Sequence, residues 1–289
     1  MRAALLTDID MSPTKLLKQV LPPFVTTLLR RMRQSIGTRE GLTYAPRGWG
    51  TPVPDSGRHE SRAIVEGDLR EWKDVWEPFS RQSTGRPWIT LPESGTQIED
   101  LYGWMRYAYV LSQAARGKRN LRILDYGGGL GHLYLIARTA LPGITMDFHC
   151  KELPGLACEG RRLNPEVIWH IDDSCLGQEH DLVILSSVLQ YVEDWKSLLR
   201  QACAATRAYL YIADTPVGQN SPTFVAIQNL NGTSFPFHQF NAAELESVAL
   251  DTGMVPVHEF PLSVHRPIRN APEQPAYYSC LFRRNADQT

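Results

Sequence analysis

The sequence predicts a Rossmann-like α/β fold, in which a mainly parallel sheet follows a mainly helical N-terminal region. Three observations carry this prediction. From Leu121 onward, short apolar segments alternate with segments of helical periodicity, as in a parallel α/β sheet. A strand that ends at Asp125 leads through a glycine-rich turn into a helix that starts at His132. The residues from Leu182 to Leu185 are all apolar, as expected of a central strand.

The expected elements of the sheet region follow one another in a regular order. Parallel strands are expected at 122–125, 144–150, 167–171, 182–185 and 208–213. Helices are expected from 132 to the turn at 142–143, and at 155–163, 195–204 and 242–252. The late runs 255–260 and 276–282 alternate apolar and polar residues, which predicts an antiparallel pair at one edge of the sheet.

The region before the sheet is expected to be helical and rich in loops. Residues 41–57 contain many glycines and prolines, which predicts a loop or boundary, whereas 60–79 and 97–116 have helical spacing. The second helix carries aromatic residues whose position suits a lid over a ligand, namely Tyr102, Trp104, Tyr107 and Tyr109, although core packing is the alternative and is favoured for Tyr102 and Tyr109. We therefore divide the chain into a helical arm and cap, 1–118, and a ligand-binding Rossmann-like domain, 119–289.

The glycine-rich turn contains Gly127, Gly128, Gly129 and Gly131 and is typical of a nucleotide-binding βα unit. Glycine permits positive φ and close approach of a ligand, and the following helix N-terminus offers free N–H donors. Asp125 lies two residues before the first glycine, where a carboxylate would repel a pyrophosphate. A cationic or zwitterionic ligand suits it better. These residues point to S-adenosylmethionine, which carries a sulfonium and an α-amine but no phosphate.

Polar residues end the expected parallel strands, at the edge where an open α/β sheet binds its ligand. Glu152 lies about 20 residues after the glycine turn, the distance at which an acidic residue binds ribose hydroxyls. Asp172 and Asp173 end the third strand, where they suit an adenine amino group, although a solvated surface carboxylate is the alternative for either. The fourth strand is followed by further candidates for cofactor binding, which are Ser186, Ser187 and Gln190.

This ordered set resembles the class I S-adenosylmethionine-dependent methyltransferases, whose core is a seven-stranded sheet with an antiparallel last strand. The resemblance covers about residues 121–284, and Asp125 with the alternate glycines matches the first motif of that superfamily. A narrower resemblance, over 44–284, is to an uncharacterised bacterial family of predicted methyltransferases often associated with polysaccharide gene clusters. The runs that carry it are APRGWG, LDYGGGLGHLYL, HCKELP, DDSC, LSSVLQYVEDW and NAPEQPAYYSCLFR.

The resemblance implies an enzyme that transfers a methyl group from S-adenosylmethionine to a small molecule or to a glycan or natural-product intermediate. It places the methionine moiety at Asp125 and the glycines, the ribose at Glu152, and the sulfonium beside 185–191. No motif identifies a catalytic base, and alignment of donor and acceptor can suffice for methyl transfer. The candidates for a base are Tyr191 and His149, with Asp214 and His238 as alternatives. A structural role is the more frequent one for such residues.

Other functions stay open on the sequence. A cyclase could use the α-amine of S-adenosylmethionine to attack its own γ-carbon, giving azetidine-2-carboxylate and methylthioadenosine instead of S-adenosylhomocysteine. A non-catalytic cofactor-binding subunit would keep the fold, but the intact Asp125, glycine turn and Glu152 argue against it. A dehydrogenase shares the strand–glycine–helix pattern, but Asp125 weighs against it. The dinucleotide-binding motif also needs a small residue at its sixth position for close packing of the helix, and this sequence has His132 there.

Composition and charge argue against several other classes of protein. The net charge of −1 gives no overall electrostatic field that would favour the binding of nucleic acid. The five cysteines are scattered and form no Cys-x-x-Cys pair, so we expect no metal, no disulfide framework and a cytoplasmic location. No apolar run reaches the roughly 20 residues that span a bilayer.

The segment 15–33 combines basic and apolar residues, as in a helix that lies on an anionic membrane surface. Pro22 and Pro23 interrupt it, which favours packing on its own domain or on a partner subunit, as in a homodimer, over membrane contact. Apart from such a subunit, the expected binding partner is a small-molecule substrate, as the resemblance implies.

Overall fold

The computed structural model describes residues 41–52, 62–82, 98–230, 233–261 and 266–285 of the 289-residue chain. All of them belong to one compact unit that begins at Gly41. The basic amphipathic segment 15–33 lies outside the described residues, so its expected packing stays a prediction.

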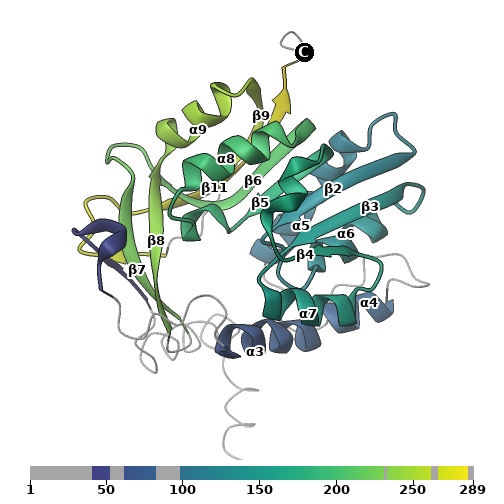
Figure 1. The fold of residues 1–289 in the computed structure, drawn as a ribbon, viewed down its shortest axis with the longest axis horizontal. Helices are drawn as coiled ribbons and strands as arrows, with labels where there is room; N and C mark the ends of the chain where they lie inside the picture. Colours follow the sequence, from purple (N-terminus) through teal and green to yellow (C-terminus); the bar gives the residue numbers. More distant parts are fainter. Residues whose placement is uncertain (1–40, 53–61, 83–97, 231–232, 262–265, 286–289) are drawn as a thin grey trace, which may run out of the picture. The chain divides into compact units, whose positions relative to one another are not determined.

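Seven strands form the main sheet of this unit (Figure 1). They are β2 (Asn120–Tyr126), β3 (Thr145–Lys151), β4 (Ile168–His170), β5 (His180–Ser186), β6 (Thr206–Gly218), β9 (Met254–Pro261) and β11 (Ala276–Arg284). Their order is β4-β3-β2-β5-β6-β11-β9. The first five pair in parallel, and β11 runs antiparallel between β6 and β9. The predicted seven-stranded, mostly parallel sheet with an antiparallel last strand is therefore confirmed.

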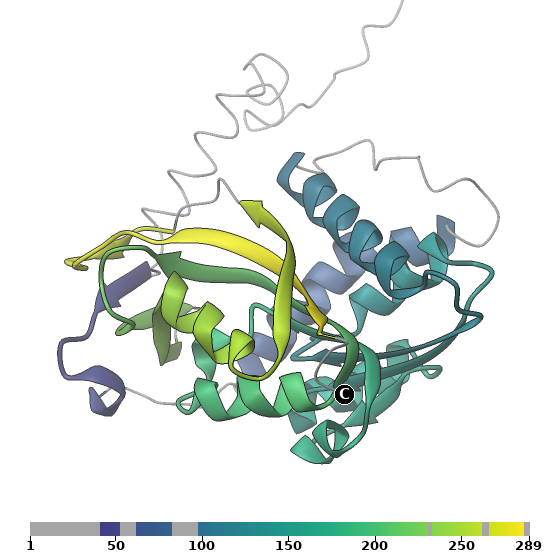
Figure 2. The same cartoon turned by 90° about the horizontal axis from the view of Figure 1, so that it is seen from above.

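Helices cover both faces of the main sheet. One face packs against α5 (Ile98–Ala114), α6 (His132–Ala140) and α7 (Pro154–Leu163). The other face packs against α8 (Trp195–Ala204) and α9 (Ala242–Leu250). Figure 2 shows α5 and α8 on opposite sides of the strand layer. No helix among the described residues is long and apolar enough to cross a membrane.

A second, smaller sheet extends from the end of β6. It contains β1 (Gly41–Tyr44), β7 (Phe224–Leu230), β8 (Thr233–Asn241) and β10 (Ile268–Arg269), and the end of β6 pairs with β8 in parallel. The prediction that 41–57 forms only a loop is wrong at its start, because β1 pairs with both β7 and β10. Sequence periodicity misses β1 and β10 because they are short, and β8 contains proline, whereas β7 has the length of the predicted strands and no such reason applies to it. The division of the chain at residue 118 stays a prediction.

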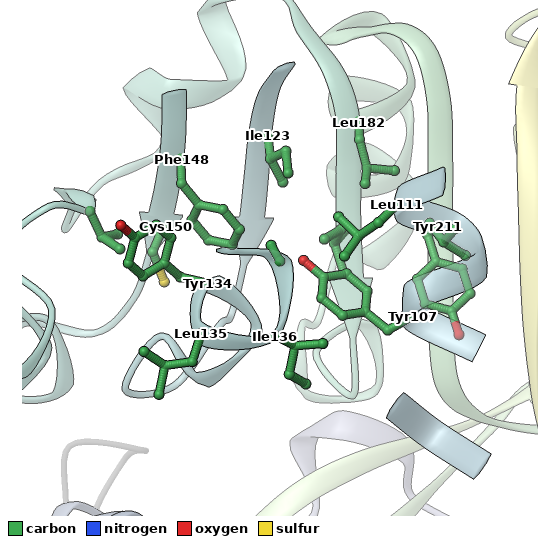
Figure 3. Packing of buried hydrophobic residues seen from close by; sticks show 14 of the residues in the cluster. Tyr107, Leu111, Ile123, Tyr134, Leu135, Ile136, Phe148, Cys150, Leu182 and Tyr211 are labelled. Carbon is green, nitrogen blue, oxygen red and sulfur yellow. The ribbon is translucent and has the colours of Figure 1, made fainter. Parts of the chain in front are cut away.

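The helices before β2 cover the carboxyl end of the parallel strands. They are α3 (Arg62–Glu71), the π-helical turn η2 (Trp72–Trp76) and α4 (Glu77–Gln82), followed by α5. Trp72 and Trp76 are buried and join the same apolar cluster as Tyr107 and Leu111 of α5. Figure 3 shows Tyr107, Leu111 and the α6 residue Ile136 gathered over the strands. These helices therefore enclose the edge at which the sequence places a ligand.

The contact between α7 and β4 is unusually close. A Cβ atom on Gly160 would overlap the indole ring of Trp169, which is itself buried and donates to the Asn164 carbonyl over 3.3 Å. By contrast, a Cβ atom on Gly143 would meet nothing within 4 Å. Only the first of these glycines is required by packing.

We predict that Gly160→Ala lowers the free energy of unfolding by about 2 kcal/mol, because overpacking outweighs the gain in helix propensity. Urea denaturation measures this loss. The matched variant Gly143→Ala should stay within about 0.5 kcal/mol of the original protein. Equal stabilities of the two variants would contradict the packing account.

Candidate functional site

The glycine turn between β2 and α6 has the strained backbone that its sequence predicts. Gly127, Gly129 and Gly131 have φ values of 80°, 59° and 81°, which residues with a side chain rarely adopt. A Cβ atom on Gly127 would lie 2.6 Å from Val188, and one on Gly128 would overlap the carboxylate of Asp125. The turn therefore folds tightly over the end of β2, and glycine is required for the close approach.

Asp125 is fully buried beneath this turn and lacks the partners that a buried carboxylate requires. Neither of its oxygens accepts a hydrogen bond within the described part of the chain. Burial, together with the nearby Glu152, raises the pKa of Asp125 to about 8. The hydroxyl of Tyr107 on α5 is also buried without a hydrogen-bond partner in the described structure, and Asp125 contributes to the raised pKa of that phenol. Two neighbouring groups are thus left unsatisfied at one place.

Two further carboxyl groups surround this place. Glu152, directly after β3, accepts hydrogen bonds from the backbone N–H of Gly129 at 3.1 Å and of Leu153 at 2.6 Å. Its pKa is raised by burial in spite of these bonds. Burial and the nearby Glu71 and Glu152 raise the pKa of Asp68 on α3 to about 6. This accumulation of buried acid favours a cationic ligand, because such a ligand would restore the charged form of each carboxyl group.

Asp172 and Asp173 lie at the end of β4 as expected, but other groups of the chain already bind them. Asp172 is exposed and caps the short 3₁₀ helix η3 (Asp173–Gly177) by accepting from the Ser174 N–H at 3.0 Å. Asp173 accepts from the Tyr126 hydroxyl at 2.7 Å and lies 3.6 Å from the Lys151 ammonium. Contact of either aspartate with adenine stays a prediction.

The remaining residues predicted near the sulfonium line a cavity of about 570 Å³ beside the turn. Ser186 ends β5, Ser187 follows it, and Gln190 and Tyr191 lie on the 3₁₀ helix η4 (Leu189–Tyr191). The rest of the lining comes from α5, α6, β6 and the small sheet, including Trp104, Tyr107, Asp214 and Phe237. The structure therefore brings these predicted residues together with residues of the N-terminal helices in one partly open cavity.

His149 and His238, by contrast, do not line this cavity. His149 lies on β3 next to Cys150, and side chains of adjacent strand residues point to opposite faces. Its Nδ1 is 2.9 Å from Nε2 of His170, and its Nε2 is 3.0 Å from Asp147. His238 stacks on Trp49 in the small sheet, with ring centroids 4.5 Å apart. Strand alternation thus places His149 outside the cavity lining, and its role as a base stays a prediction.

An ion pair that the sequence analysis missed organises the cavity wall. Arg106 on α5 is buried, and its guanidinium lies 3.0 Å from Asp214 on β6 and donates to the Ser279 hydroxyl. Asp214 also has a Ser186 hydroxyl at 3.5 Å. Asp214 and Ser187 have φ values of 50° and 51°, an uncommon backbone conformation that clusters at functional sites. No local pattern in the sequence signals this pairing, since 108 residues separate the two charges.

His132 was also missed, although its position gave a signal. It follows the last glycine of the turn and starts α6, so it must lie at the carboxyl end of β2. Its ring stacks on Trp76 with centroids 4.8 Å apart, and it lines the cavity. Burial lowers its pKa to about 4, against the opposing influence of Asp214. His132 is therefore neutral at pH 7 and can accept a hydrogen bond.

Comparison with solved structures shows the fold class. A candidate sarcosine dimethylglycine methyltransferase from Galdieria sulphuraria superposes with a TM-score of 0.50 at 12% identity, over 76% of this chain and 98% of that chain. The magnesium protoporphyrin IX methyltransferase ChlM from Synechocystis PCC 6803, with S-adenosylhomocysteine bound, gives 0.46 at 13% identity, over 76% and 100%. The N-methyltransferase NodS from Bradyrhizobium japonicum WM9 gives 0.42 at 13% identity, over 72% and 97%.

The first of these similarities, together with the strand order, shows that the chain has the fold of the class I S-adenosylmethionine-dependent methyltransferases. No protein-family model matches the sequence, and no curated protein matches it significantly.

We predict that the ligand-free protein loses stability between pH about 6 and about 8, and that Asp125→Asn removes most of this loss. The pKa of Asp125 is higher in the folded than in the unfolded chain, so the folded state binds the extra proton and is destabilised as pH rises. Urea denaturation at several pH values measures the slope of the free energy of unfolding against pH. Asp251→Asn, at the exposed end of α9, should keep it. An unchanged slope in Asp125→Asn would contradict the assigned protonation.

Proposed function

We propose that this protein is an S-adenosylmethionine-dependent methyltransferase that acts on a small molecule. The observation that carries the proposal is the buried carboxyl group of Asp125, whose oxygens have no partner beneath a glycine turn in the described structure. A group of this kind is costly to maintain unless a ligand satisfies it. The fold supports S-adenosylmethionine as that ligand, because its α-amine and sulfonium both carry positive charge.

The residues present fit this cofactor. Asp125 and the hydroxyl of Tyr107 would hold the polar end of its methionine moiety. Glu152 would bind the ribose, because each carboxylate oxygen keeps a second lone pair after accepting the bond from Gly129 or Leu153. Asp172 or Asp173 would lie near the adenine. When bound, S-adenosylmethionine supplies an electrophilic methyl group on its sulfonium.

The chain itself would contribute enclosure and alignment. Trp76, Trp104 and Tyr107 cover the cavity from the N-terminal side and exclude water. Arg106 acts as a positioning residue, since it holds Asp214 and Ser279 in place. The neutral ring of His132 can accept a hydrogen bond from the hydroxyl or amine of an acceptor. Holding two reactants in alignment is a sufficient source of rate acceleration for such a transfer.

The cavity supports transfer to an acceptor over internal cyclisation. Its volume of about 570 Å³ extends from His132, at the start of α6, to Phe237 of β8 and Tyr277 of β11, whereas Asp125, Glu152 and the glycines of the turn lie outside its lining. A cyclase would need no such second binding space. The aromatic walls suit a small ring, such as a sugar unit or an aromatic natural-product intermediate.

We expect Asp125→Asn to weaken S-adenosylmethionine binding by about 100-fold, because a charge-assisted hydrogen bond is lost in a buried place. Glu152→Gln should weaken it by about tenfold, since an amide still accepts one bond but can no longer hold both hydroxyls as a carboxylate does. Isothermal titration calorimetry measures both affinities, with Asp251→Asn as the matched control. Unchanged affinity in both variants would remove the cofactor assignment.

The reaction type is tested by the coproduct that accumulates when the protein is incubated with S-adenosylmethionine and a small-metabolite extract. Mass spectrometry should detect S-adenosylhomocysteine that depends on the extract. Methylthioadenosine formed without any extract would indicate cyclisation and contradict the proposed transfer.

A further inference from the structure

The cavity lining includes an arginine, Arg266, that has no acidic partner in the described part of the chain. The guanidinium of Arg266 lines the cavity and makes no hydrogen bond or ion pair with the described part of the chain. It lies close enough to Tyr191 and Tyr277 to oppose the rise in pKa that burial imposes on both phenols. Arg266 is exposed, and it lies on the cavity lining beside these two phenols.

The other ionisable groups of the lining do not balance this charge. Arg106 and Asp214 form an ion pair at 3.0 Å and cancel each other. His132 contributes no charge at neutral pH, because its pKa is about 4. Arg266 thus leaves the described lining with an excess charge of about +1.

A second polar side chain of the same cavity, that of Gln190, hydrogen-bonds to the Tyr191 hydroxyl but keeps an unsatisfied oxygen in the described structure. Gln190 is 2% exposed, and its Oε1 accepts no hydrogen bond within the described structure. Its neighbour Tyr191 is fixed by a 3.0 Å hydrogen bond to Gln228 and by edge contacts with Phe235 and Phe237. The unsatisfied oxygen of Gln190 therefore lies beside a side chain with several contacts and can accept a hydrogen bond from a ligand.

We propose that the acceptor is a small cyclic carboxylate, whose carboxylate binds Arg266 and whose hydroxyl or amine donates to Gln190. This proposal rests on the proposed function, because it assigns the second substrate of the same site. The planar fork of arginine matches a carboxylate in geometry. One carboxylate also balances the single excess charge, whereas a phosphate group of charge about −2 would leave negative charge facing Asp214.

The test compares pairs of small ring compounds that differ only in one group, such as 4-hydroxybenzoate and 4-hydroxybenzamide. Ligand-observed NMR measures their affinities with and without S-adenosylhomocysteine, so that loss of anion preference and loss of cofactor binding are separate results. The carboxylates should bind about tenfold more tightly than the amides, and Arg266→Gln should reduce the preference to about twofold or less. Arg269→Gln, an exposed arginine on β10 outside the lining, is the matched control and should keep the preference.

Three results would overturn the proposal. The first is equal affinity of acid and amide, or no carboxylate binding at millimolar concentration, in the original protein. The second is an equal loss of preference in Arg266→Gln and Arg269→Gln, which would indicate a general surface effect. The third is a large loss of S-adenosylhomocysteine affinity in Arg266→Gln, which would assign this arginine to the carboxylate of the cofactor. Absence of S-adenosylhomocysteine binding in the original protein would instead contradict the proposed function.

Discussion

The burial of the Asp125 carboxyl group is the constraint on which the rest of the site depends. The side chain lies at the end of β2, and the glycine turn closes over it so tightly that a Cβ atom on Gly128 would overlap its oxygens. A carboxyl group in this position is neutral at pH 7 unless positive charge arrives, because its pKa is about 8. The folded protein therefore carries an energetic cost that a cationic ligand relieves.

In the proposed function, the elements around this unsatisfied carboxyl group form a cofactor side and an acceptor side of one site. The helices α3 and α5 and the turn η2 enclose the cofactor side, where Glu152 and Asp68 add further acid. The small sheet continues β6 beyond Asp214 and forms the far wall of the cavity. The Arg106–Asp214 pair lies between the two sides and fixes α5 to β6. In the function that we propose, acid on one side and an arginine on the other would separate a cationic cofactor from an anionic acceptor.

Much of this arrangement was predictable from the sequence, and the successes share a physical reason. The carboxyl ends of parallel strands must meet at one edge, so Asp125, Glu152, Ser186 and Gln190 could be placed near each other from strand order alone. His132 was within reach of the same argument, because it follows the last glycine directly. His149 stays a prediction as a base, but the alternation of faces along β3 places it outside the cavity lining, and the sequence argument did not take that alternation into account.

Other features required contacts between distant parts of the chain. Arg106 and Asp214 are 108 residues apart, and β1 joins the small sheet only by pairing with β7 and β10. Within the described part of the chain, the lack of a partner for the Arg266 guanidinium and for the Gln190 oxygen can be recognised only from the three-dimensional structure. Such absences of partners define the chemistry of the cavity, and no local pattern encodes them.

Proton release on binding of S-adenosylmethionine tests the central claim most directly. Isothermal titration calorimetry at about pH 7, repeated in buffers of different ionisation enthalpy, counts the protons exchanged with the buffer. If Asp125 is protonated in the free protein and ionises against the cationic ligand, about one proton is released, and Asp125→Asn releases none. Tight binding without proton release, or the same release in both proteins, would contradict the account.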